Sequence, residues 1–254
     1  MSINSKHNWH APTINFAINS TLDIPGSKSA TNRAFVLAAL GNSKSTISNP
    51  LFARDTNLML DALKQLGCDV LKKENSVEIS PMKKNHDEIS IDVGLAGTVM
   101  RFLPPLASLA KGLISFDGDA RSHQRPLGPV IKALESLGVS IEHQGRYSLP
   151  LVINGAGYIN GGEVEIDASA SSQFLSSLLL VAPLMKQGLK IKSVGKNLPS
   201  KPHIEMTIAM LAKYGAVVDT SIANQWSVMP TELSGVDVVI EPDLSNAAVF
   251  MAAP

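Results

Sequence analysis

Internal repetition is the feature of this sequence that most restricts the folds open to it. Three stretches begin alike, with a short alternating strand pattern followed by small residues and a long apolar run, and they open at 22–29, 91–98 and 164–171. The openings recur at an interval of roughly 70 residues, and self-similarity at a fixed interval marks a chain built from stacked units. We therefore expect three copies of one supersecondary unit that share a core.

A second helical pattern follows in each unit and ends at a glycine. The apolar positions of 59–66 have the i, i+3, i+4, i+7 spacing of an amphipathic helix, and Gly67 comes next. Glycine is frequent just after a helix because it accepts a left-handed backbone. Equivalent helices recur at 127–134 before Gly138 and at 204–211 before Gly215, and strand patterns follow at 68–71, 76–80, 139–142, 149–153, 216–220 and 226–229.

The two helices of a unit differ in their expected surroundings. The first helix, at 30–40, 99–110 and 172–185, is apolar on nearly every side and is predicted to be buried. The second carries a polar face and is predicted to lie at the surface. The sequence thus predicts an α/β fold, a lobe of three β-α-β-α-β-β repeats with buried inner helices and outer sheets.

A fourth opening occurs at 238–245, and a further buried helix is predicted at 246–253, just before the sequence stops. A buried helix with no following strand has nothing to pack on. We therefore expect the chain to be part of a longer protein. The alternative is a short C-terminal helix docked on the lobe.

Composition excludes several classes of function. The 22 basic and 22 acidic residues cancel and only 5% of residues are aromatic, so nucleic acid or anionic lipid would find neither a basic field nor a stacking surface. The longest apolar stretch, 174–185, is too short to span a bilayer, and residues 1–10 lack the apolar core of a signal peptide. We expect a cytoplasmic protein without nucleic-acid or membrane partners.

Metal and disulfide chemistry also lacks a sequence signal. Cys68 is the one cysteine, so an internal disulfide and a C-x-x-C zinc site are excluded, and it is expected to be a core residue. The six histidines have neither H-x-x-x-H nor H-E-x-x-H spacing. We predict no metal and no cofactor.

Hydroxyl residues recur near the predicted starts of the inner helices. The repeat register aligns Ser29, Thr98, Ser171 and Ser245. A hydroxyl at such a place accepts a hydrogen bond from a free backbone N–H and stabilises the helix by about 1 kcal/mol. Capping alone accounts for Thr98 and Ser245.

Two of these helix starts have more cationic and hydrogen-bonding side chains than capping requires. Lys28 and Arg33 accompany the first start, and the second has several donors ahead of an apolar helix, in the stretch 169–173 with Ser172 and Gln173. Backbone N–H groups and the helix dipole favour an anion at such a start, whereas cations there are unfavourable to the helix. Lys28 and Arg33 therefore need a compensating anion, which favours a ligand.

Other cations fall near the junctions between units. Arg101 follows Gly97, Arg125 opens the second surface helix, and Lys201 opens the third. Taken singly, each is typical of solvated surface charge. Together they predict a site for a multiply anionic small molecule, because arginine binds carboxylate and phosphate in bidentate fashion.

Five motifs in order resemble those of the 5-enolpyruvylshikimate-3-phosphate synthase family. They are PGSKSATNR at 25–33, LAGTVMR at 95–101, QRPLG at 124–128, SSQFL at 171–175 and SKPH at 200–203. The resemblance covers essentially the whole chain but roughly the first 60% of a family member. It implies two lobes of three units each. Residues 1–20 would be a strand segment of the second lobe, 21–234 a complete lobe, and 235–254 the truncated start of the second.

The resemblance also implies a reaction and its residues. The family transfers the enolpyruvyl group of phosphoenolpyruvate to shikimate 3-phosphate, without a cofactor, and releases phosphate. Lys28, Gly97 and Arg125 would contact phosphoenolpyruvate, with Lys28 and Arg125 stabilising developing charge. Shikimate 3-phosphate would be held by Ser29, Arg33, Ser171, Ser172 and Ser200, with Gln173 between the ligands and Thr98, Arg101, Lys201 and His203 as further candidates. The full-length protein is expected to be a monomer.

The chain departs from the family pattern in places. Leu95 stands where many members have Asn, and His203 stands where many have Tyr, which puts a ring contact with the ligand in question. The acid/base carboxylates of the family lie in the other lobe, so no catalytic acid or base is assigned here. Because general acid–base chemistry needs positioned groups, this chain is predicted to bind shikimate 3-phosphate weakly without turnover.

Two other functions stay open at this point. The related UDP-N-acetylglucosamine enolpyruvyl transferases typically carry a cysteine on a loop of the second unit, and 117–125 has none. A non-enzymatic anion-binding lobe or scaffold would leave Lys28, Arg33 and Arg125 dispersed rather than converging.

Overall fold

Three four-stranded sheets surround the inner helices in the part of the chain that the structure describes. The computed structural model describes residues 13, 15, 19–83, 85–195 and 198–252. Within this part, no helix is long and apolar enough to cross a membrane. The sheet of the second unit has the order β4–β5–β7–β6, built from β4 (Asn85–Asp92), β5 (Lys111–Asp117), β7 (Leu151–Ala156) and β6 (Ser140–Glu142). The third unit repeats this order with β8 (Gly162–Ile166), β9 (Leu189–Ser193), β11 (Gln225–Val228) and β10 (Val218–Asp219).

In each sheet the opening strand is parallel to its neighbour and the other pairs are antiparallel. β4 pairs in parallel with β5, and β8 with β9. This is the geometry that follows when a helix carries the chain from one strand to the next, as α3 and α5 do. The repeated order confirms the predicted β-α-β-α-β-β unit.

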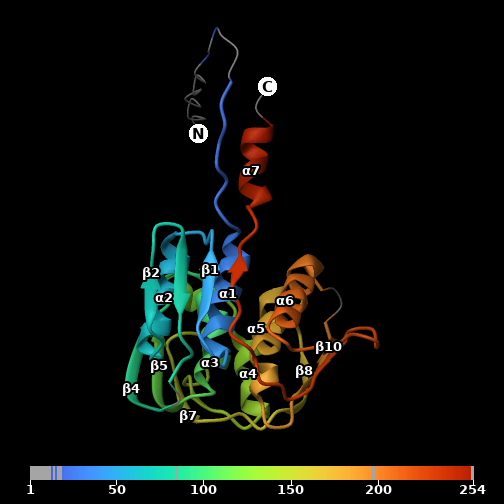
Figure 1. The fold of residues 1–254 in the computed structure, drawn as a ribbon. Coiled ribbons are helices and arrows are strands. Elements are labelled where there is room, and N and C mark those ends of the chain that lie inside the picture. The colour runs from blue at the N-terminus through green and yellow to red at the C-terminus, as the bar shows by residue number, and fades with distance from the viewer. Residues whose placement is uncertain (1–12, 14, 16–18, 84, 196–197, 253–254) are drawn as a thin grey trace, which may run out of the picture.

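The inner helices form the core, enclosed by the sheets (Figure 1). They are α1 (Lys28–Leu40), α3 (Gly97–Ala107) and α5 (Ser172–Val181), and each packs against the other two. Phe35, Phe102 and Phe174, one from each helix, are fully buried. Burying such a side chain contributes about 1.5–3 kcal/mol, so helices that are apolar on every side are stable only here. α5 ends earlier than predicted, and a 3₁₀ turn at Ala182–Leu184 follows it.

The outer helices are α2 (Arg54–Gln65), α4 (Gly128–Ser136) and α6 (Lys201–Lys213). A left-handed glycine follows each of them, with φ +80° at Gly67, +86° at Gly138 and +97° at Gly215. α2 packs on β4 and α4 packs on β8, so these two outer helices each reach the first strand of the next unit. The predicted alternation of buried and surface helices is confirmed.

The first unit opens differently from the prediction. Residues 22–24 do not form a strand, and Leu22 is exposed. The edge of the first sheet, of order β12–β1–β3–β2, is instead supplied by β12 (Val238–Val239), which pairs in parallel with β1 (Ser45–Ser48) beside β3 (Ser76–Ile79) and β2 (Val70–Lys72). Pro25 lacks the N–H that a strand ladder requires, and only Gly26 bridges to Pro242.

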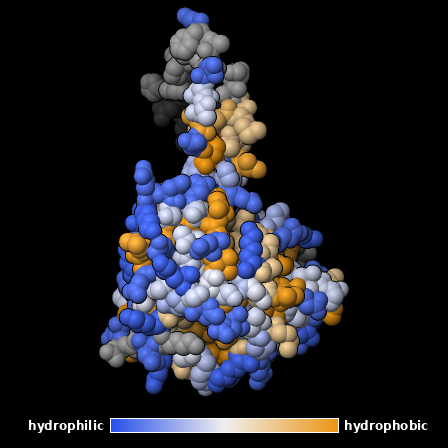
Figure 2. Space-filling model, viewed as in Figure 1, coloured by the Kyte–Doolittle hydropathy of each residue, from blue (hydrophilic) through white to orange (hydrophobic). Residues whose placement is uncertain are grey.

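The predicted fourth inner helix is also different. Helix α7 (Leu244–Met251) forms, but of its residues only Ala247 is buried, so the prediction of a buried helix is wrong. α7 projects from the body beside the segment that leads into α1 (Figure 1), and its apolar side chains are visible on that projection in Figure 2. Residues 253–254, and 1–12, 14 and 16–18 of the predicted strand segment, lie outside the described residues. The lobe boundary at 234/235 stays a prediction, and β12 beyond it pairs with the first sheet.

Candidate anion-binding site

A small pocket lies where the starts of α1, α5 and α6 meet. Its volume is about 200 Å³, and we call it the anion pocket. Hydroxyl, amide and cationic side chains dominate its lining, which consists of Ser29, Arg33, Ala170, Ser171, Ser172, Gln173, Pro199, Ser200 and His203. Seven of the predicted site residues therefore converge on one cavity: Ser29, Arg33, Ser171, Ser172, Gln173, Ser200 and His203.

Arg33 is buried at this pocket, and no acidic residue of the described part of the chain pairs with it. It is 1% exposed. Its guanidinium donates to Thr207 Oγ1 at 2.7 Å, Ser29 O at 2.9 Å, Ser176 Oγ at 3.2 Å and His203 O at 3.3 Å, and it lies over the Phe102 ring at 5.1 Å. All these partners are neutral, and burial lowers the pKa of Arg33 to about 10. A buried charge without a counter-charge costs several kcal/mol, and an anion would offset that cost.

Arg101 repeats this situation one helix away. It is 5% exposed, and its Nη1 donates to Gln173 Oε1 at 2.8 Å. The Nε atom is buried without a hydrogen-bond partner. Burial, with the nearby charge of Arg125, lowers the pKa of Arg101 to about 10. Gln173 thus connects the anion pocket to a second buried cation.

Gly97 and Arg125 lie on the far side of Arg101. Nη1 of Arg125 donates to Leu95 O at 2.6 Å. A Cβ on Gly97 would lie 2.5 Å from Arg125 Nη2 and 3.2 Å from Arg101 Nη1. Two guanidinium groups therefore converge on the N-terminus of α3, whose dipole itself favours an anion. The positive charge gathered here favours a second small anion.

Lys28 already has a counter-charge within the chain. Its Nζ lies 3.3 Å from Asp55 Oδ2, at the start of α2. The compensating anion predicted for Lys28 is thus present within the chain, and for this residue it does not point to a ligand. Lys28 is about half exposed and precedes Ser29 of the anion pocket in the first turn of α1.

The hydroxyl groups divide into structural and available ones. Ser171 caps α5, accepting from the Gln173 N–H at 3.2 Å. Thr98 does not cap α3: its Oγ1 accepts from Asn32 Nδ2 at 2.6 Å. Ser245 does not cap α7 either, because Asp243 does so, and the capping interpretation of these two residues is wrong. In the described part of the chain, no hydrogen bond involves the hydroxyls of Ser29, Ser172 and Ser200.

The start of α6 is strained at the pocket. Ser200 has φ +53° and ψ +50°, a left-handed conformation that is unusual for a residue with a side chain. Such strain costs about 1–3 kcal/mol and collects at functional sites. Lys201, the next residue, does not line the anion pocket and faces a separate hollow with Ile208 and Trp226. Nothing in the sequence indicated that Ser200 would line the pocket and that Lys201 would not.

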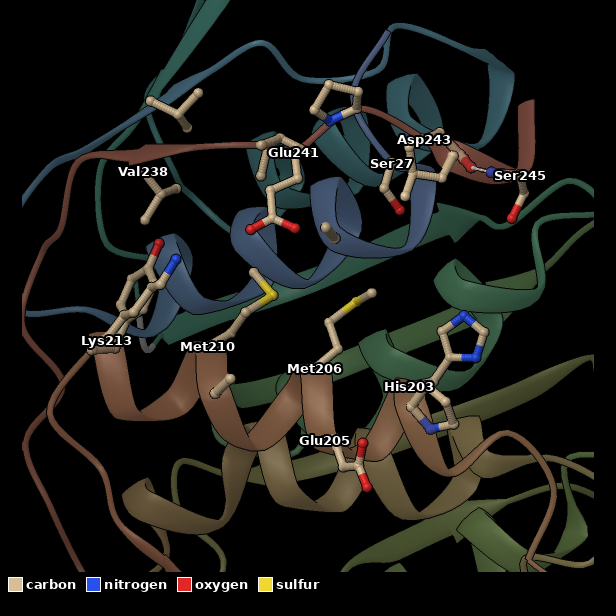
Figure 3. A pocket seen from close by; sticks show the side chains of 18 residues that line it. Ser27, His203, Glu205, Met206, Met210, Lys213, Val238, Glu241, Asp243 and Ser245 are labelled. Atoms are coloured by element: carbon tan, nitrogen blue, oxygen red, sulfur yellow. Dashed lines mark hydrogen bonds between the residues drawn. The ribbon is translucent and has the colours of Figure 1, made fainter. Parts of the chain in front are cut away.

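A larger groove adjoins the anion pocket. It has a volume of about 530 Å³ and lies between α6 and the linking segment, residues 238–245. Met206 and Met210 of α6 extend toward it from one side and Glu241 from the other (Figure 3). His203 lines both cavities. The pseudo-symmetric positions, between α2 and β4 and between α4 and β8, are packed instead.

Several residues of the site carried no predicted role. Thr207 and Ser176 orient Arg33, and Thr207 Oγ1 also lies 3.1 Å from Ser176 Oγ. Asn32 joins α1 to α3 through Thr98. A polar residue inside an otherwise apolar helix was the sequence signal that could have identified such residues. Among the described residues, no group of three His, Cys, Asp or Glu could hold a metal ion.

Comparison with known proteins agrees with this arrangement. The family model described as EPSP synthase (3-phosphoshikimate 1-carboxyvinyltransferase) matches residues 12–254. Two solved structures of EPSP synthase from Acinetobacter baumannii are similar to the chain, each at 25% identity and a TM-score of 0.78 over 91% of this chain. The chain spans about half of their length, 52% and 51%. With its ordered motifs, its three-unit lobe and this match, the chain belongs to the EPSP synthase family.

Proposed function

We propose that this chain provides the shikimate 3-phosphate-binding side of a 3-phosphoshikimate 1-carboxyvinyltransferase, the enzyme of aromatic amino acid biosynthesis that transfers an enolpyruvyl group from phosphoenolpyruvate. The observation that carries the proposal is Arg33, a buried guanidinium in a pocket lined by serines, which has no carboxylate partner among the described residues. Serine hydroxyls and arginine are the groups that bind phosphate and carboxylate well. Shikimate 3-phosphate carries both anions.

Phosphoenolpyruvate is assigned to the neighbouring cations. Arg125 and Arg101 converge at Gly97, where the absence of a Cβ lets both guanidinium groups approach the start of α3, and a helix start favours a phosphate. Gln173 would lie between the two ligands, since its side chain already accepts from Arg101. Lys28 and Arg125 would stabilise the negative charge that develops during transfer.

Acid–base chemistry is the missing part. None of the residues that line the anion pocket in the described part of the chain is Asp or Glu. Asp55 pairs with Lys28 and is not among the residues that line the anion pocket. Proton addition to phosphoenolpyruvate needs a positioned acid, so we infer that the chain binds substrate without turning it over.

The wider setting follows from the same argument. Zero net charge favours small-molecule partners over nucleic acid or anionic lipid. A biosynthetic enzyme that uses phosphorylated metabolites works where they are made, so we propose a cytoplasmic protein. We propose that the full-length protein is a monomer.

Calorimetry on the purified chain tests the assignment. We expect measurable binding of shikimate 3-phosphate, much weaker binding of shikimate, and no phosphate release when phosphoenolpyruvate is added. Turnover would overturn the binding-only proposal. Binding of UDP-N-acetylglucosamine without any binding of shikimate 3-phosphate would overturn the substrate assignment.

A further inference from the structure

His203 is a titratable residue in the wall of the anion pocket. It lies in the first turn of α6, and Figure 3 shows its ring standing off that turn. Its backbone carbonyl accepts from Arg33 Nη2 at 3.3 Å and from Thr207 Oγ1 at 2.9 Å, which fixes this turn. Among the described residues, no hydrogen bond involves either ring nitrogen.

The charges that face His203 come from three elements. Arg33 approaches from α1, Lys201 and Glu205 lie on its own helix, and Glu241 and Asp243 lie across the groove on the linking segment. Asp243 is committed to capping α7. Burial and then the charge of Arg33 lower the pKa of His203 below its ordinary value. Without a bound ligand the neutral form of this imidazole is therefore favoured at pH 7.

Charge balance in the pocket changes when a ligand enters. A phosphate monoester carries nearly two negative charges near neutral pH, and shikimate 3-phosphate adds a carboxylate. Arg33 is the one lysine or arginine side chain among the residues that line the pocket in the described part of the chain. Its charge cannot rise further, because arginine is already protonated. His203 is the lining group that can gain a positive charge, since an opposite charge within about 4–6 Å favours the protonated form.

We propose that His203 takes up a proton when a phosphorylated ligand fills the anion pocket, so that affinity for that ligand rises as the pH falls from 8 to 6.5. The inference rests on the proposed function and adds a proton to its binding step. The imidazole takes one proton from solvent and forms one N–H bond, and no bond of the ligand is made or broken. Linkage makes the two effects reciprocal: a ligand that raises the proton affinity of the ring is bound more tightly where protons are more abundant.

The size and limits of the effect follow from the same linkage. Uptake of one proton per ligand strengthens binding by at most about tenfold per pH unit between the free and bound pKa values of the ring. Below about pH 6 the phosphate itself gains a proton, and the advantage fades. The useful window is therefore pH 6.5–8.

The experiment is a calorimetric titration of the chain with shikimate 3-phosphate at pH 7 in buffers of different ionisation enthalpy. The dependence of the heat on the buffer gives the number of protons taken up. We expect clear uptake, approaching one proton, for the unaltered chain and almost none for His203→Gln. His143→Gln is the matched control, because His143 pairs with Glu135 and is not among the residues that line the pocket.

Uptake that persists in His203→Gln would overturn the inference, and so would ligand binding by the unaltered chain without uptake. Absence of any shikimate 3-phosphate binding would overturn the proposed function and this inference together. A ring-nitrogen NMR titration of the unaltered chain needs no substitution: the His203 pKa should rise on adding ligand, and an unchanged or lower pKa contradicts the inference.

Discussion

At the residue scale, the molecule separates its charges into two kinds. Exposed ion pairs such as Lys190–Glu163 lie on the sheets and contribute little to stability. Arg33 and Arg101 are buried, and their hydrogen-bond partners within the described ranges are all neutral. Taking a charge out of water costs several kcal/mol, and replacing buried ionic groups by apolar groups of similar volume is often neutral or stabilising. We therefore attribute these two buried arginines to ligand binding rather than to stability of the fold.

Arg33→Met tests this separation. We expect the ligand-free variant to be as stable as the unaltered chain or more stable, while shikimate 3-phosphate no longer raises its melting temperature. Thermal melts with and without ligand provide the measurement. Arg146→Met, the same change at an exposed arginine, is the control. A variant that is strongly destabilised yet still stabilised by ligand would contradict the account.

Gly97→Ala tests the second anion position. The added Cβ would meet the far end of Arg125, which can move, so the fold is expected to survive. Phosphoenolpyruvate should bind on the order of tenfold more weakly in the presence of shikimate 3-phosphate, a loss of about 1.4 kcal/mol. Gly128→Ala is the control, because its Cβ would meet only Tyr147, at ordinary contact distance. Equal losses in both variants, measured by calorimetry, would refute the assignment.

Cys68 offers a test of burial. It is 5% exposed, and desolvation raises the pKa of its thiol to about 12. A raised pKa means that the unreactive thiol form persists at every pH below that value. We expect no labelling by a thiol reagent at pH 8 until denaturant unfolds the chain. Rapid labelling of the native chain would show that the segment between α2 and β2, which holds Cys68, is open.

At the element scale, local chemistry made part of the fold predictable. Gly67, Gly138 and Gly215 marked the ends of the outer helices because a left-handed residue is needed there. The inner helices were recognisable because their apolar residues cover every side. β12 was not assignable to the first sheet, since its pairing with β1 joins residues distant in sequence. The groove beside α6 follows from that same pairing and had no local signal.

The inner and outer helices should differ in their sensitivity to truncation. Leu178→Ala, in α5, removes a fully buried side chain and should cost about 2–5 kcal/mol. Met206→Ala, in α6, shortens a half-buried side chain beside the groove and should cost less than about 1 kcal/mol. Denaturant unfolding monitored by circular dichroism measures both losses. Similar losses would contradict the division into core and surface helices.

At the scale of the whole molecule, the repeat predicted the three-unit lobe and the convergence of its helix starts. Ser29, Arg33, Ser171 and Ser172 meet in one pocket because equivalent positions of stacked units lie at one end. The repeat could not predict which individual side chains would pair with each other. Asp55 lies beside Lys28 only through the placement of α2, and no periodicity specifies that contact.

Helix α7 should make the isolated chain associate. Leu244, Val249, Phe250 and Met251 are 56–78% exposed, and apolar surface gathered on one element promotes contact between molecules. We expect the apparent mass in light scattering to rise with concentration and Phe250→Glu to reduce the rise. Val217→Glu, at an exposed valine near β10, is the control for added charge. Concentration-independent mass in the unaltered chain would contradict the prediction.

The central claim is that Arg33 and the serines around it bind the anionic groups of shikimate 3-phosphate. A crystal structure of this chain with that ligand tests it most directly. We expect phosphoryl or carboxylate oxygens of the ligand within about 2.7–3.2 Å of the Arg33 guanidinium. The same distances are expected to hydroxyls among Ser29, Ser171, Ser172 and Ser200. Ligand seated elsewhere, with Arg33 still bonded only to neutral groups of the chain, would contradict it.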